Sequence, residues 1–247
     1  AIGWCAFDYN THKDFGSGDR ICYHGVMDMF RLPKFAASVY GSQVAPEKKV
    51  VLKPVTFWAR GERSIGGVFP LVILTNCDSV SIQFGKNEPI VVTEKEESFS
   101  HLPYPPFVID TRQISMEKIG AWGMRWEDLT LTGFIDGKEV AVVRMPKDPV
   151  PSNLSVVVDD SKLNKGEKDV SRVIVSIQDQ YGNTLPLADP VVSVEITGPA
   201  RIQGPKVFAL KGGSSAFWVE TNGTAGDVKV SISTPGFEQK TIGITVL

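Results

Sequence analysis

The sequence contains few of the residues on which disulfide frameworks and metal sites depend. It has 247 residues, of which three are cysteine and three are histidine. The odd number of cysteines argues against a disulfide framework in a chain of this size. Cys22 lies near His12 and His24, but this spacing lacks the two separated ligand pairs of known zinc sites. We therefore expect no bound metal and no other cofactor.

Long apolar runs and an excess of charge of one sign are also missing. No apolar stretch approaches the roughly 20 residues that a membrane-spanning helix needs. The chain has 26 Lys and Arg against 28 Asp and Glu, so its net charge is −2. Nucleic-acid-binding proteins gather positive charge on one surface, and no such cluster occurs here. We therefore expect no membrane span and no nucleic-acid partner.

The sequence does contain many short stretches that are typical of β-strands. Between residues 46 and 146 these stretches are rich in β-branched and aromatic residues and are separated by turn residues. Asp136-Gly137 is a strong signal for a hairpin turn. After the Pro-containing hinge "KDPVPSN" the pattern continues, and Val173, Val175 and Ile177 alternate with more polar positions. These patterns predict two tandem β-sandwich, immunoglobulin-like domains, at residues 45–147 and 148–247.

Residues 1–44 have a different pattern, which predicts one β–loop–α unit. The apolar run "AIGWCAF" reads as a buried strand, and a glycine-rich loop follows it. Pro33 suits the first position of a helix, and Gly41 suits its C-terminal cap. The helix would present one apolar face, made by Phe35, Ala36, Val39 and Tyr40.

Several stretches of the sequence together carry a resemblance to one known family. In the first 44 residues they are "GWCAFDYNTH" and "DRICYHGVMDMFRLPKFAASVYGSQ". In the first predicted sandwich they are "VILTNCDSVSIQFG", "HLPYPPFVID" and "DLTLTGFIDGKEVA". In the second it is "NLSVVVDDSKLNKGEKDVSRVIVSIQDQYGN". Together these stretches resemble glycoside hydrolase family 2, and bacterial β-galactosidases in particular, and the resemblance covers nearly the whole chain.

The resemblance implies that residues 1–44 are the end of a catalytic (β/α)8 barrel, comprising its eighth strand, a loop and its eighth helix. The family cleaves β-glycosides with retention, using two glutamates that lie on earlier barrel strands. None of the 28 Asp and Glu residues here matches either motif. The expectation is a C-terminal part that holds no catalytic residue and is inactive alone. Its expected partners are the upstream barrel, a β-galactoside or oligosaccharide substrate, and a possible second copy of the chain. A bacterial, periplasmic or secreted protein is favoured over a cytoplasmic one.

The same resemblance places four residues at the sugar pocket. Phe7 occupies the place of an aromatic wall at the end of the eighth strand, where it either stacks on the sugar or belongs to the barrel rim. Asp8 either binds a hydroxyl or caps the loop, and Tyr9 is a second wall or a structural aromatic. His24 matches a position that reaches the pocket, although an ordinary loop histidine is the alternative.

Other functions stay open at this point. A tandem-sandwich module that binds carbohydrate or acts as an adhesin would explain residues 45–247 but not residues 1–44. Other family 2 activities, such as β-mannosidase or β-glucuronidase, also remain, although Cys22-Tyr23-His24 replaces the Asn-x-Lys with which glucuronidases read a sugar carboxylate. Trp58, Trp122 and Trp126 could form a sugar-binding platform, but tryptophans of sandwiches are more often core residues.

Overall fold

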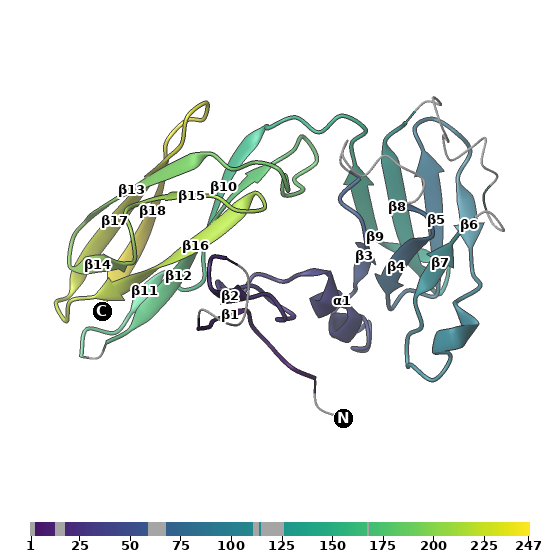
Figure 1. Cartoon of the computed structure of the whole chain (residues 1–247), viewed down its shortest axis with the longest axis horizontal. Coiled ribbons are helices and arrows are strands. Elements are labelled where there is room, and N and C mark those ends of the chain that lie inside the picture. Colours follow the sequence, from purple (N-terminus) through teal and green to yellow (C-terminus); the bar gives the residue numbers. More distant parts are fainter. Residues whose placement is uncertain (1–2, 13–17, 59–67, 111–113, 115–125, 167) are drawn as a thin grey trace. The chain divides into compact units, whose positions relative to one another are not determined.

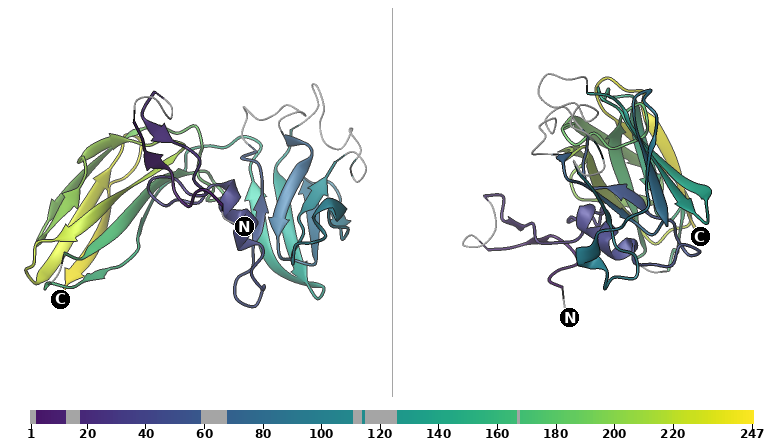
Figure 2. Two further views of the ribbon diagram at one scale, coloured as in Figure 1. Left: turned by 60° about the horizontal axis from the view of Figure 1, so that its bottom comes forward. Right: turned by 90° about the vertical axis from the view of Figure 1, so that its right-hand side faces the viewer.

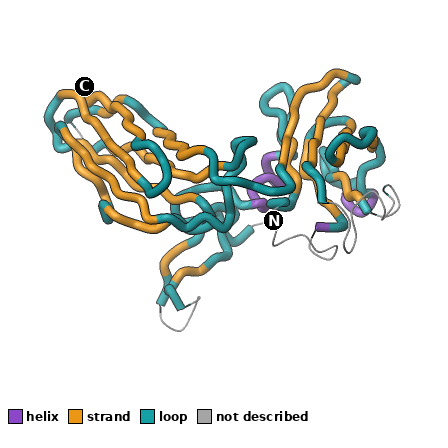
Figure 3. Tube along the Cα trace, turned by 90° about the horizontal axis from the view of Figure 1, so that it is seen from above, coloured by secondary structure: helices purple, strands orange, loops and turns teal. Residues whose placement is uncertain are grey.

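The computed structural model describes residues 3–12, 18–58, 68–110, 114, 126–166 and 168–247. Contacts within the chain divide it into two compact units, Ala1–Asp148 and Pro149–Leu247. Strands predominate in both units, as Figure 3 shows. The mainly β fold predicted from the sequence is therefore confirmed. No helix within the described ranges is long and apolar enough to cross a membrane.

The first unit contains two antiparallel sheets that enclose one hydrophobic core (Figure 1). The strand orders of these sheets are β3-β4-β7 and β6-β5-β8-β9, and a separate two-stranded ribbon pairs β1 with β2. The elements are β1 (Tyr9–Asn10), β2 (Ile21–Cys22), α1 (Phe35–Gly41), β3 (Leu52–Pro54), β4 (Leu71–Thr75), β5 (Ser79–Phe84), β6 (Ile90–Val92), the 3-10 helix η2 (Glu97–Phe99), β7 (Phe107–Ile109), β8 (Leu129–Ile135) and β9 (Lys138–Met145).

The turn between β8 and β9 has the geometry that its sequence predicts. Asp136 and Gly137 both have positive φ angles, +50° and +71°. Two consecutive positive φ angles are characteristic of a type I′ turn, whose twist matches that of the paired strands. The Asp78 carboxylate also accepts a hydrogen bond from the Asp136 N–H at 2.9 Å. The predicted hairpin is confirmed.

Trp58 is a core residue of the first sandwich. Its side chain is buried, and its ring stacks against Trp126 and Phe84 at centroid distances of 4.2 Å and 5.9 Å. The indole N–H donates to the backbone carbonyl of Glu127 at 2.9 Å. Trp58 is therefore not available to a sugar-binding platform, and Trp122 lies outside the described residues.

The helix differs from its prediction at both ends. Lys34 is the N-cap, so Pro33 precedes the helix instead of occupying its first turn. Gly41 is the last helical residue, and the C-cap Ser42 keeps a right-handed conformation while its N–H bonds to the Ser38 carbonyl at 2.9 Å. The predicted glycine cap is wrong because the chain leaves this helix without a left-handed residue. Much of the predicted apolar face is exposed, at Ala36, Val39 and Tyr40.

Phe35 and the residues after α1 attach the helix to the first sandwich. The Phe35 ring lies 4.9 Å from that of Phe57, and the Lys53 ammonium lies 5.4 Å from the Phe35 ring. Burial lowers the pKa of Lys53 below its ordinary value. Gln43 exchanges two hydrogen bonds with the backbone of Tyr104, at 2.9 Å and 3.0 Å. Residues 35–44 therefore pack on the sandwich.

The strand predicted at "AIGWCAF" is not formed in the described part of that run, residues 3–7. Trp4 is 77% exposed, and Phe7 joins only an isolated parallel bridge to Met27. A buried strand requires hydrogen-bonded neighbours on both sides, and in the described residues this segment has one short partner. The prediction of a strand here is therefore wrong for this chain by itself.

The second unit is also a sandwich of two sheets around one core (Figures 1 and 2). Their strand orders are β10-β12-β16-β14 and β11-β18-β17-β13-β15, antiparallel except where β11 runs parallel to β18. The strands are β10 (Asn153–Val158), β11 (Lys162–Leu163), β12 (Val170–Gln178), β13 (Val191–Thr197), β14 (Ala200–Gln203), β15 (Val207–Ala209), β16 (Ser214–Thr221), β17 (Gly226–Ser233) and β18 (Lys240–Val246).

Strand β12 confirms the alternation that was predicted for it. Val173, Val175 and Ile177 are all buried in the core, at 1% exposure or less. Arg172 and Ile174, on the other face, are half-buried. Since successive side chains of a strand point to opposite faces, this pattern fixes the register of β12 in the sandwich.

Candidate functional site

The four residues predicted at the sugar pocket lie in one small substructure, residues 3–12 and 18–34. In it β1 and β2 form a two-stranded antiparallel ribbon in which Tyr9 faces Cys22. The chain before this ribbon runs parallel to residues 25–27: the Asp8 N–H donates to the Met27 carbonyl, and the Met27 N–H donates to the Ala6 carbonyl, both at 2.9 Å. These bonds place Phe7, Asp8 and Tyr9 beside the loop that carries His24.

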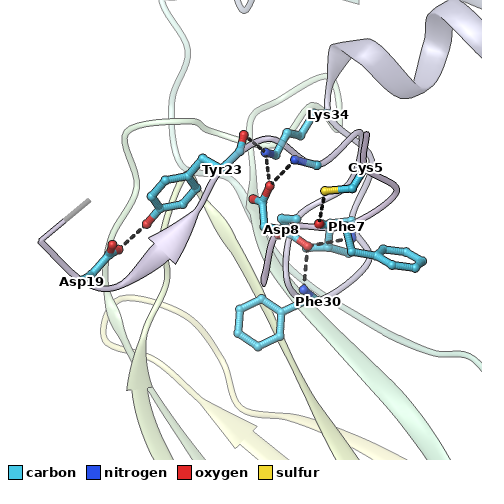
Figure 4. A network of polar contacts seen from close by, with 10 residues as sticks. Cys5, Phe7, Asp8, Asp19, Tyr23, Phe30 and Lys34 are labelled. Atoms are coloured by element: carbon cyan, nitrogen blue, oxygen red, sulfur yellow. Dashed lines mark hydrogen bonds and ion pairs between the residues drawn. The ribbon is translucent and has the colours of Figure 1, made fainter. Parts of the chain in front are cut away.

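Asp8 is the buried polar centre of this substructure (Figure 4). Its side chain is only 2% exposed. The carboxylate accepts hydrogen bonds from the Lys34 ammonium at 2.6 Å and from the Gly25 N–H at 2.8 Å. A buried carboxylate needs such partners because burial removes its hydration. Asp8 thus joins three segments that are far apart in sequence.

Gly25 is required at its position because the chain on the other side comes very close. A Cβ atom there would lie 2.2 Å from the Asp8 nitrogen, 2.3 Å from the Phe7 carbonyl carbon and 2.4 Å from the Met27 oxygen. All three are backbone atoms, so no side-chain rotation relieves the contact. The absence of a side chain at Gly25 allows its N–H to reach the Asp8 carboxylate.

Exposed aromatic side chains surround this buried centre. Phe7 is 39% exposed, and the guanidinium of Arg31 lies 5.5 Å from its ring. Tyr23 is 51% exposed, its hydroxyl donates to the Asp19 carboxylate, and the Lys34 ammonium lies 5.9 Å from its ring. Arg31 has a positive φ of 63°, in a turn where the Asp28 carboxylate accepts two backbone N–H groups at 2.8 Å each. An aromatic ring beside a guanidinium is a surface suited to the C–H face and the hydroxyls of a sugar.

The remaining predicted residues differ in exposure. Tyr9 is half-buried, and His24 is exposed directly before Gly25. Phe7, Tyr9 and His24 lie near Asp8 because their segments are hydrogen-bonded to one another. Of these four residues, only Asp8 is buried. Sequence reasoning missed Lys34, Arg31 and Tyr23. The one signal for them in the sequence was Asp8, a carboxylate directly after an apolar run. Such a carboxylate needs a cationic partner if it is buried, but the sequence does not identify that partner.

The pKa of Tyr9 is raised above its ordinary value. The largest cause is a hydrogen bond between the Tyr9 hydroxyl and Cys22, its cross-strand partner, and this effect outweighs an opposing contribution from Trp4. A raised pKa means that the fold favours the neutral phenol. The stability it contributes is complete below the unfolded value near 10 and is lost as the pH rises through the folded pKa.

We therefore expect the tyrosinate absorbance of Tyr9 to develop at a higher pH than that of an unperturbed tyrosine. The measurement is a spectrophotometric titration of the whole chain, with Tyr9→Phe identifying the Tyr9 component among the five tyrosines. Cys22→Ala should return that component to its ordinary range. An identical Tyr9 titration in both proteins would contradict the role given to Cys22.

Two further features limit which ligands the substructure could hold. An apolar hollow of about 370 Å³ adjoins it. Its lining comes from the N-terminal segment, the loop before α1 and α1 itself: Gly3, Cys5, Ala6, Val26, Met27, Ala37 and Tyr40. Within the described ranges, no three His, Cys, Asp or Glu side chains gather as metal ligands.

The chain is similar in sequence to bacterial proteins named β-galactosidase. Residues 154–243 match the model of the glycoside hydrolase family 2 C-terminal domain 5. The chain is 58% identical over 215 residues to a β-galactosidase of Thermoanaerobacterium thermosulfurigenes, covering 87% of this chain and 30% of that protein. It is 47% identical over 214 residues to a β-galactosidase of Rhizobium meliloti, covering 87% of this chain and 28% of that protein. The chain thus spans less than a third of these relatives.

The chain is also similar to a shorter sequence and to a solved structure. A β-galactosidase sequence of Rhizobium radiobacter is 40% identical over 132 residues, which are 53% of this chain and 96% of that sequence. The crystal structure of a β-glycosidase from Bacteroides vulgatus has a TM-score of 0.68 at 19% identity, covering 98% of this chain and 30% of that one. The similarity to the solved structure supports the fold, and the sequence matches show that the chain is homologous to these β-galactosidases. The chain therefore belongs to glycoside hydrolase family 2 and is β-galactosidase-like in sequence.

Proposed function

We propose that this chain is the C-terminal part of a retaining β-galactosidase that hydrolyses terminal β-galactosides. The observation that carries the proposal is the 58% identity, over 87% of the chain, to a protein named β-galactosidase. In this proposal residues 1–44 complete a catalytic (β/α)8 barrel, and residues 45–147 and 148–247 are accessory sandwich domains. The family-model match at residues 154–243 supports the last of these assignments.

The chemistry of retention requires residues that we assign to the rest of the enzyme. A retaining glycosidase needs one carboxyl group as acid/base and a second as nucleophile, about 5–5.5 Å apart. Asp8, the buried carboxylate of the candidate site, is engaged by Lys34 and the Gly25 N–H. An ion-paired carboxylate held in this way suits a structural role better than nucleophilic attack. We therefore propose that the chain alone is inactive.

The contribution of this chain to catalysis would be to shape the rim of the sugar pocket. The exposed ring of Phe7 would stack on the C–H face of the galactosyl unit and exclude water from it. Tyr9 and His24 would offer a hydroxyl and an imidazole to sugar hydroxyls. Asp8 would act by fixing the segment that carries Phe7 and Tyr9 against the loop that carries His24.

The test is hydrolysis of chromogenic β-galactoside, β-glucuronide and β-mannoside by the purified chain, alone and mixed with the folded upstream polypeptide of the same enzyme. We expect no hydrolysis by the chain alone and hydrolysis of the β-galactoside by the mixture. Loss of stacking in Phe7→Ala should lower kcat/KM of the mixture about 2- to 10-fold. Phe99→Ala is the matched control, because Phe99 is exposed to a similar extent, 42%, but lies in η2.

Each alternative has its own outcome in this test. Hydrolysis by the chain alone would show that the catalytic carboxylates have been misplaced. Preference for the glucuronide or the mannoside would replace the galactosidase assignment with another activity of the family. If no mixture hydrolyses any substrate although the chain and the upstream polypeptide are both folded, a binding or adhesive module would be favoured.

A further inference from the structure

Arg31 has a backbone conformation that is unfavourable for an arginine. Its φ angle is +63°, in the left-handed region that glycine adopts freely and other residues adopt at a cost. The turn around it enforces this conformation. The Asp28 carboxylate accepts hydrogen bonds from the Phe30 and Leu32 N–H groups, both at 2.8 Å, and the Asp28 carbonyl accepts one from the Arg31 N–H at 3.0 Å. A glycine at position 31 would form the same turn without the cost.

This turn is fixed to the segment that carries Phe7. Met27 pairs with Phe7 on one side, through a parallel bridge, and with Pro33 on the other, through an antiparallel bridge. The two bridges bring the turn beside the Phe7 side chain. The guanidinium of Arg31 consequently lies over the Phe7 ring, 5.5 Å from its centroid.

The stability of this contact does not explain why an arginine occupies the position. The Arg31 side chain is exposed, and among the described residues it forms no ion pair with a carboxylate. A cation–π contact at an exposed site stabilises a protein by less than a left-handed conformation typically costs a residue other than glycine. Residues held in such conformations are concentrated at functional sites. The arginine side chain therefore has a use beyond the stability of the turn.

The Phe7 ring is the group that Arg31 can influence. The ring is 39% exposed, so packing restrains its rotamer only in part. Because the guanidinium covers one face of the ring, the opposite face is the one available to a sugar. A ring whose rotamer is already set loses less conformational entropy when it stacks on a ligand.

We propose that Arg31 is a positioning residue of the sugar pocket, which holds the Phe7 ring in one orientation with its uncovered face toward the substrate. The inference rests on the proposed function, because it takes Phe7 as the stacking residue. Arg31 would act through Phe7 and would not itself contact the galactosyl unit. An arginine would be kept in a position that suits glycine because only a long cationic side chain reaches the ring.

The first measurement does not depend on activity. In the isotopically labelled chain, three-bond couplings of Phe7 report its χ1 rotamer. We expect one dominant rotamer in the unchanged chain, several in Arg31→Gly, and one again in Arg31→Lys, whose ammonium can also lie over the ring. Exchange of the Leu32 amide, which donates to Asp28, should be no faster in Arg31→Gly, because glycine fits the turn. A single Phe7 rotamer in Arg31→Gly would overturn the proposal.

The second measurement is kcat/KM for a chromogenic β-galactoside, with the chain mixed with the upstream polypeptide. Arg31→Gly should lower it about 2- to 5-fold, which corresponds to the strength of an exposed cation–π contact. The same substitution should have no further effect once Phe7 is replaced by Ala, since Arg31 acts through that ring. Arg31→Lys should retain most of the activity. A loss that persists in the Phe7→Ala background would contradict the role given to Arg31.

Arg20→Gly is the matched control. Arg20 is also exposed and has a φ of +61°, but in the described part of the chain its guanidinium lies over no aromatic ring. This variant relieves the same backbone cost and should leave kcat/KM unchanged. Equal losses in the two glycine variants would overturn the proposal. A mixture that hydrolyses no β-galactoside would contradict the proposed function instead, and the Phe7 rotamers would then decide whether Arg31 positions the ring.

Discussion

Gly213→Ala is expected to destabilise the second unit by more than about 4 kcal/mol, a loss that few single substitutions cause. Gly213 has a φ of +78°, and a Cβ atom there would lie 1.9 Å from the Leu185 oxygen and 2.7 Å from its carbonyl carbon. Both contacts are with backbone. Moving the Leu185 backbone away would break the hydrogen bonds of the Leu185 N–H to the Ile177 carbonyl, at 2.9 Å, and of the Ala188 N–H to the Leu185 carbonyl, at 3.1 Å.

The neighbouring Gly212 is a matched control for this substitution. It also has a positive φ, +64°, but a Cβ atom there would meet nothing within 4 Å. Gly212→Ala should therefore cost only the left-handed conformation itself, about 1–2 kcal/mol. Hydrogen exchange of peptides from residues 149–247 measures both losses, with residues 1–148 as an internal reference. Equal destabilisation by the two variants would show that the Leu185 backbone yields easily to the added methyl group.

Features that depend on local sequence could be predicted for this protein. The dipeptide Asp136-Gly137 determines the type of its turn because both residues tolerate a positive φ angle. The alternation in β12 marked its buried face, since one face of a sandwich strand must be apolar. These signals involve neighbours along the chain, so one sequence was sufficient to find them.

Features that depend on distant partners could not be predicted. The contact of Gly213 with Leu185 and the ion pair of Asp8 with Lys34 join residues more than 20 positions apart. Their residue types are common, and nothing in the sequence links the partners. The prediction of a strand at "AIGWCAF" failed for a related reason. Apolar character favours burial, but within the described ranges residues 3–7 do not have the two neighbouring strands that a buried strand requires.

The ion pair between Asp8 and Lys34 is expected to determine whether residues 3–12 and 18–34 keep their structure. The Asp8 side chain is 2% exposed and that of Lys34 is 33% exposed. Removing one partner of a buried pair leaves the other charge without compensation, which typically costs about 3–5 kcal/mol. Lys34→Met should therefore speed exchange of the Gly25 amide, which donates to Asp8 at 2.8 Å, by about 100-fold or more, up to the rate of an unprotected amide.

A double-mutant cycle with Asp8→Asn tests whether the pair itself is responsible. If it is, Asp8→Asn should add little once Lys34 is already Met, because the interaction has then been removed. Lys147→Met is the comparison for an exposed pair: Lys147 lies 3.4 Å from the Glu127 carboxylate with both side chains about a third or more exposed, so its loss should change stability by at most about 1 kcal/mol. Additive effects of the two substitutions at Asp8 and Lys34 would mean that the Gly25 hydrogen bond holds this loop without the ammonium. In that case the ordering of Phe7, Tyr9 and His24 would depend on this hydrogen bond and on backbone contacts, and not on the ion pair.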